Sequence, residues 1–131
     1  MRDERGGDRL SGSKRDRDRA TEAFRRWARA GCPAAESIRH SKGAGDLRAC
    51  AAVWAELSSG SGRANRAWAE IMTAVSEVYM AYPDKPLRRS DMTARVRRAA
   101  YLLTADERTV YRWLAEARRM WMAYRASKTC Q

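Results

Sequence analysis

The stretch that most constrains the fold of this chain is RRAAYLLTADERTVYRWL, which runs from Arg97 to Leu114. It predicts two helices joined by a very short turn. The apolar residues that end the first helix are followed closely by a polar residue that can cap a second helix, and then by apolar residues at helical spacing. A small residue in the first helix and apolar residues in the second would let the helices cross closely, as in a helix-turn-helix. The positions that carry this pattern are Ala100, Leu103, Asp106, Val110 and Trp113.

The turn departs from the commonest version of this motif at one position. Thr104 stands where a glycine is usual. A left-handed backbone at a β-branched residue costs on the order of 1 kcal/mol or more. We therefore expect a turn that is one residue longer or shaped differently, and a plain helical hairpin remains the alternative to a DNA-binding motif.

The second helix would present basic and aromatic side chains on its outer face. We predict that Arg108 and Arg112 read base edges, and that Tyr111 contacts a base methyl group or a phosphate. Phosphate contacts are predicted for four further arginines around this helix, as a set that positions it. These are Arg95, Arg97, Arg98 and Arg119.

The distribution of charge favours a polyanionic partner for the C-terminal part. The chain of 131 residues has 27 basic and 16 acidic residues, one His and a net charge of +11. Residues 85–131 hold 12 basic and 4 acidic residues, whereas residues 1–19 hold 7 and 5. The positive surplus therefore coincides with the predicted helix-turn-helix, and double-stranded DNA is the expected partner.

The remaining chain predicts an all-α protein, since no segment alternates with a period of two. We expect a disordered tail over residues 1–19, N-terminal helices within residues 20–57, and a DNA-binding unit of three helices over residues 63–126. The sequence SSGSG at residues 58–62 is the expected joint between the last two parts. The expected helices span residues 18–30, 47–57 with Asp46 as cap, 63–82, about 90–103 and 107–126, with a turn or two of helix within 34–40.

The two N-terminal tryptophans supply more aromatic area than a three-helix unit needs for its own fold. Regular spacing favours a role in covering the core for Trp54, and we predict a partner-binding surface at Trp27.

The sequence offers no catalytic constellation and no cofactor or metal site. Neither a phosphate-binding glycine loop nor a nucleophile elbow occurs, and the three cysteines lack the paired spacing of zinc ligands. We expect free thiols at Cys32, Cys50 and Cys130, and no enzymatic activity. No apolar run reaches the length of a membrane span, so a soluble, cytoplasmic protein without a membrane partner is expected.

Residues 67–126 resemble phage-encoded transcription regulators with a helix-turn-helix. The segment ERTVYRWLAEARRMW at residues 107–121 is similar to their recognition helices, in which a Thr-Val-x-Arg core is common. Size and layout are most similar to late-gene antitermination proteins of the Q type, and AFRRWARAG at residues 23–31 is similar to the opening helix of one branch. The zinc cysteines of another branch are missing. The resemblance implies a protein that binds DNA near a late promoter and engages bacterial RNA polymerase.

Two other classes of protein remain open. A small terminase subunit, which packages phage DNA, also combines a helix-turn-helix with helical segments for homo-oligomerisation. A helical protein–protein module with incidental basic charge is the second alternative. A simple transcription activator is not distinguishable from an antiterminator by sequence.

Overall fold

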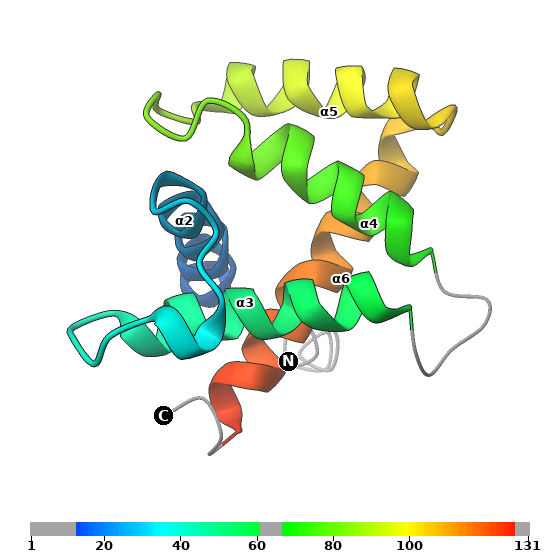
Figure 1. The fold of residues 1–131 in the computed structure, drawn as a ribbon. Helices are drawn as coiled ribbons and strands as arrows, with labels where there is room; N and C mark the ends of the chain where they lie inside the picture. Colours follow the sequence, from blue (N-terminus) through cyan, green and yellow to red (C-terminus); the bar gives the residue numbers. More distant parts are fainter. Residues whose placement is uncertain (1–12, 61–66, 128–131) are drawn as a thin grey trace, which may run out of the picture.

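The computed structural model describes residues 13–60 and 67–127, and most of these residues are helical (Figure 1). No strand occurs in either range, which confirms the predicted all-α class. The elements are α2 (Lys14–Arg29), the 3-10 turn η1 (Ala35–Ser37), α3 (Ala44–Ser59), α4 (Trp68–Val75), the π-helical turn η2 (Ser76–Met80), α5 (Arg89–Leu103) and α6 (Glu107–Ala126). None of these helices combines the length and apolar character that a membrane span requires.

Helix α2 begins earlier than the sequence pattern indicates. The Ser13 hydroxyl accepts a hydrogen bond from the Asp16 backbone N–H at 3.1 Å, and the Asp16 carboxylate accepts one from the Ser13 N–H at 3.4 Å. This reciprocal capping box fixes the first turn. The prediction of disorder is therefore wrong for residues 14–19, whereas residues 1–12 lie outside the described part.

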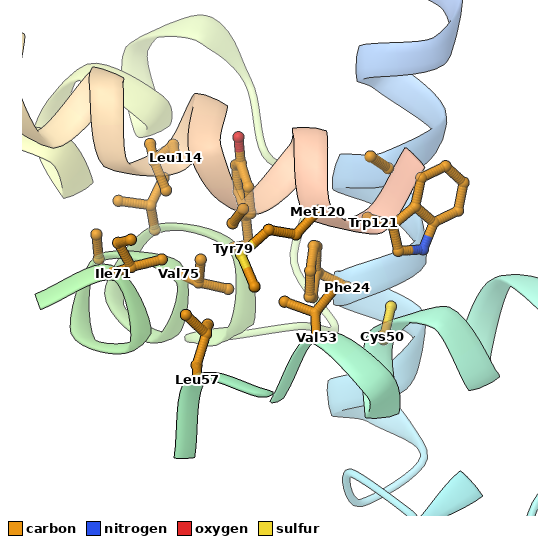
Figure 2. Packing of buried hydrophobic residues seen from close by; sticks show 14 of the residues in the cluster. Phe24, Cys50, Val53, Leu57, Ile71, Val75, Tyr79, Leu114, Met120 and Trp121 are labelled. Carbon is orange, nitrogen blue, oxygen red and sulfur yellow. The ribbon is translucent and has the colours of Figure 1, made fainter. Parts of the chain in front are cut away.

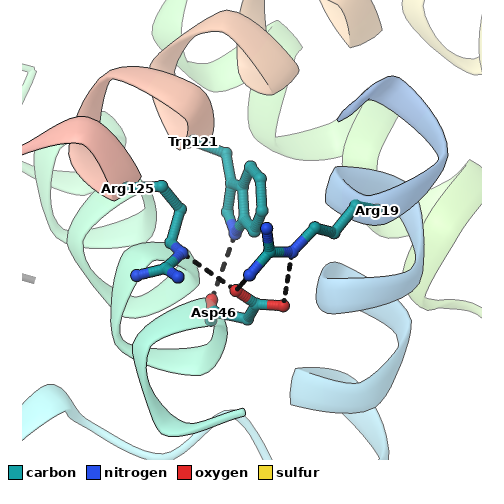
Figure 3. Close-up of polar contacts among 4 residues, drawn as sticks. All are labelled: Arg19, Asp46, Trp121 and Arg125. Carbon is teal, nitrogen blue, oxygen red and sulfur yellow. Dashed lines mark hydrogen bonds and ion pairs between the residues drawn. The ribbon is translucent and has the colours of Figure 1, made fainter. Parts of the chain in front are cut away.

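Helix α3 begins at Ala44, so Asp46 lies inside its first turn and is not the predicted cap. Its side chain is 9% exposed, and the carboxylate pairs with the guanidinium of Arg19 on α2 and with that of Arg125 on α6 (Figure 3). The Trp121 indole N–H also donates to the Asp46 carbonyl at 3.1 Å. This cluster joins the first, second and last helices of the described part.

The predicted helix at residues 63–82 is observed from Trp68 to Met80 in two forms. Regular α4 passes into η2 at Ser76, and the helix stops before Tyr82, whose φ is 53°. Its buried face carries Ile71, Val75, Val78 and Tyr79, as the spacing predicts. Residues 61–66, which include the first part of the expected helix, lie outside the described ranges.

Both halves of the chain contribute to one hydrophobic core (Figure 2). Phe24 of α2 and Val53 of α3 lie near Met120 of α6, Leu114 of α6 lies near Ile71 and Val75, and the rings of Phe24 and Tyr79 stack at 6.3 Å between centroids. Helix α6 crosses α3 and α4 in Figure 1, with its second half packed on the N-terminal helices. Helices α2 and α3 therefore share one core with α4, α5 and α6.

Trp27 belongs to this core and does not form the predicted partner surface. Its side chain is 2% exposed, and its indole N–H donates to the Pro33 carbonyl at 2.9 Å. The ring of Trp54, which is half-buried, packs edge-on against the ring of Trp27, with 5.6 Å between the ring centroids. Trp27 falls on the apolar face of α2 with Ala20, Ala23 and Phe24, which explains its burial.

Candidate nucleic-acid interface

Helices α5 and α6 are joined by the three residues Thr104–Asp106. Thr104 adopts the left-handed conformation, with φ 53° and ψ 48°, and the Ala105 N–H donates to the Ala100 carbonyl at 2.9 Å. This is the short turn that a glycine would make, so the expectation of a longer or differently shaped turn is wrong. The left-handed backbone at Thr104 is unfavourable, but Ala100 of α5 and Val110 of α6 are both buried. Packing of the two helices at these residues holds the turn in this conformation.

Asp106 caps α6 as predicted. Its Oδ1 accepts a hydrogen bond from the Thr109 backbone N–H at 2.7 Å. Bonds to Thr109, and to a smaller extent the cations Arg108 and Arg112, hold the pKa of Asp106 below its ordinary value. The cap is therefore ionised at neutral pH and complements the positive end of the helix dipole.

The first half of α6 separates apolar and polar side chains onto opposite faces. Val110 and Leu114 are fully buried, whereas Arg108, Tyr111 and Arg112 are exposed. The Arg112 guanidinium donates a local hydrogen bond to the Thr109 hydroxyl, at 3.1 Å. The three residues predicted to read bases therefore share one accessible face beside the turn.

Three of the four arginines predicted to hold phosphates lie in ion pairs that leave them accessible. Arg97 of α5 meets Glu107 of α6 at 3.3 Å, and Arg98 meets Glu77 at 3.3 Å, with both arginine side chains 70% exposed. Arg119 pairs with Glu116 at 2.6 Å within α6 and is 40% exposed. Such exposed pairs are weak and can exchange a carboxylate for a phosphate.

Arg95 has a structural role and does not fit the predicted phosphate set. Its Nη1 donates to the carbonyls of Val78 at 3.0 Å and Ala81 at 2.9 Å. Its guanidinium also lies 5.6 Å from the centre of the Tyr82 ring. These carbonyls lie at and just after the end of the helical segment, where no following helical turn supplies donors, so Arg95 completes the C-terminal end of η2.

Two exposed side chains beside this face were missed by the sequence analysis. Tyr101 is 84% exposed and Leu102 is 46% exposed, at the end of α5. The signal was present, because both fall between the inward positions Ala100 and Leu103 and cannot share their face.

The cysteines of the described part do not suggest a reactive or metal-binding centre. Cys32 is exposed and Cys50 is buried, and both are free thiols. Burial raises the pKa of the Cys50 thiol far above its ordinary value, with a smaller contribution from Asp46. Across residues 13–60 and 67–127, no three His, Cys, Asp or Glu side chains group as metal ligands would. Cys130 lies outside these ranges.

No family model, curated protein or solved structure matches this chain.

Proposed function

We propose that this chain is a sequence-specific double-stranded DNA-binding protein that acts through a helix-turn-helix formed by α5, the turn and α6. The observation that carries the proposal is the accessible face of Arg108, Tyr111 and Arg112, held at the start of a capped helix directly after a three-residue turn. Helix α4 packs against both α5 and α6 and is the supporting third helix of the unit.

In this proposal the first two turns of α6 enter the major groove. The guanidinium groups of Arg108 and Arg112 would each donate two hydrogen bonds to a guanine edge, the commonest specific contact with DNA. Tyr111, between them along the chain, would contact a thymine methyl group or a phosphate. Arg97, Arg98 and Arg119 would bind phosphates and set the register of the helix.

The charge of the chain supports a nucleic-acid partner for this part. Residues 85–131, which contain α5 and α6, carry 12 basic and 4 acidic residues. Of these acids, Asp106 is used as a cap and Glu107 and Glu116 lie in ion pairs. The uncompensated positive charge would attract DNA of any sequence before the base contacts form.

The biological role within this proposal is transcription regulation in a phage, of the Q-like antitermination type that the α6 sequence resembles. A contact with RNA polymerase would then be required. Because Trp27 is buried, that contact would have to use another surface of the molecule.

Selection from a library of randomised DNA duplexes tests the proposed function. The full chain should enrich duplexes that share one short sequence, and Arg108→Ala together with Arg112→Ala should abolish that enrichment. Recovery of unrelated sequences by the wild-type chain would contradict sequence-specific binding.

A further inference from the structure

Exposed apolar area is concentrated at the corner where α5 meets α6. Among the described residues, four large hydrophobic side chains are exposed, and three lie here: Tyr101 at 84%, Leu102 at 46% and Tyr111 at 43%. The fourth, Tyr82, precedes the other end of α5. Two accessible tyrosines within ten residues offer aromatic faces that the fold itself does not use.

The spacing of the two tyrosines from one ion pair indicates that both lie on the same side of the corner. Arg97 Nε lies 3.3 Å from Glu107 Oε2, so this face of α5 adjoins the first turn of α6. Tyr101 follows Arg97 by four residues and Tyr111 follows Glu107 by four residues, and side chains at this spacing lie on one face of a helix. The spacing therefore indicates that each tyrosine lies on the side of its own helix that carries one partner of the ion pair.

The charges around the tyrosines favour nucleic acid over a neutral or basic protein surface. Arg97, Arg108 and Arg112 are exposed, whereas the carboxylates of Asp106 and Glu107 are engaged by the helix cap and the ion pair. Alternation of cationic and aromatic side chains is the arrangement on which unpaired bases stack while phosphates are neutralised. In an intact duplex the faces of the bases are covered by their neighbours, so only an unstacked base could use Tyr101.

We propose that the α5–α6 corner binds an unpaired base through Tyr101, so that the protein prefers duplex DNA with a local distortion over fully paired DNA. This inference rests on the proposed DNA-binding function and specifies which conformation of DNA the protein binds best. Tyr101 is the stacking platform, and Tyr111 stays with the groove contacts of α6.

Fluorescence anisotropy with the full chain tests this inference. The probes are a mixed-sequence duplex and the same duplex with three unpaired nucleotides at its centre. The wild-type chain should bind the second probe at least about fivefold more tightly, the effect of stacking one base on an aromatic side chain. Tyr101→Ala should remove this preference by weakening only the distorted complex, and Tyr101→Phe should keep it. Tyr82→Ala is the matched control, an exposed tyrosine beside Arg95 and Lys85 that should leave the preference unchanged.

The alternative outcomes separate this inference from the proposed function. Equal affinity of the wild-type chain for both probes, or an equal loss for both in Tyr101→Ala, would overturn the stacking role and leave DNA binding intact. Absence of any DNA binding at low salt would overturn the proposed function as well. A Tyr101→Ala variant with unchanged affinity for both probes would assign the corner to a protein partner instead.

Discussion

Asp46 on α3 binds Arg19 on α2 through two contacts, from Nη2 to Oδ1 at 2.9 Å and from Nε to Oδ2 at 3.2 Å. The same Oδ1 lies 2.9 Å from Nε of Arg125 on α6. One buried carboxylate thus connects the first described helix with the last, and the guanidinium groups of Arg19 and Arg125 both pair with it.

Asp46→Ala should lower the free energy of unfolding by about 2–3 kcal/mol, because it leaves two arginines without their buried partner. The loss stays below that of a fully buried pair, since the Arg19 side chain is 53% exposed. Urea unfolding measures it. Asp18→Ala is the control, because the Lys14–Asp18 pair is exposed and should contribute less than about 0.5 kcal/mol. Equal effects of the two substitutions would contradict this assignment.

Thr104→Gly should stabilise the protein by about 0.5–1 kcal/mol. A left-handed backbone is unfavourable for threonine and not for glycine, and this gain exceeds the extra freedom of glycine in the unfolded chain. Thr93→Gly, inside α5, should instead destabilise the protein, because no such strain is relieved there. Thermal unfolding of both variants gives the comparison. A destabilising Thr104→Gly would show that the turn needs the threonine side chain.

The contacts of Arg95 and Arg97 predict that replacing Arg95 affects stability and not DNA binding, and that replacing Arg97 affects DNA binding and not stability. Arg95→Ala should lower the free energy of unfolding by about 1–2 kcal/mol, because two carbonyls lose their donor. It should leave the dependence of DNA affinity on salt unchanged. Arg97→Ala should have little effect on stability and lower the salt slope by about one unit. A reduced slope in Arg95→Ala would return that residue to the phosphate set.

The cap at Asp106 predicts a pH dependence of stability. Its pKa in the folded protein is lowered, so the cap stabilises the fold above the unfolded pKa of about 3.9 and loses this effect as the pH falls through the folded pKa. Urea midpoints of the wild type and of Asp106→Ala should therefore differ at neutral pH and converge in acid. A constant difference across this range would show that the charge of the cap is unimportant.

The sequence predicted α6 well because its signals are local. An aspartate cap and the spacing of Val110, Leu114, Ala117 and Trp121 fix both its start and its buried face. The same spacing implied that Arg108 and Arg112 are exposed. Their proposed role in reading DNA stays a prediction.

The features that the sequence did not predict depend on partners far along the chain. An aspartate at the start of a helix is typical of a cap. That Asp46 is instead a buried ion-pair partner follows from the approach of Arg125 on α6, far along the chain. Arg95 stands in a run of arginines that predicted phosphate contacts, and its structural role follows from the carbonyls at the end of η2. Trp27 lies on a short amphipathic helix whose partner could not be identified before the fold was known.

The affinity of Arg112→Ala for DNA tests the central claim most directly. The measurement compares a duplex enriched by selection with a scrambled duplex. Arg39→Ala serves as the control, because Arg39 is exposed and the segment between η1 and α3 that contains it lies away from the α5–α6 corner (Figure 1). We expect Arg112→Ala to lose about 1–3 kcal/mol of binding free energy on the selected duplex and little on the scrambled one, and Arg39→Ala to change neither. Equal losses on both duplexes, or none, would contradict base reading by α6.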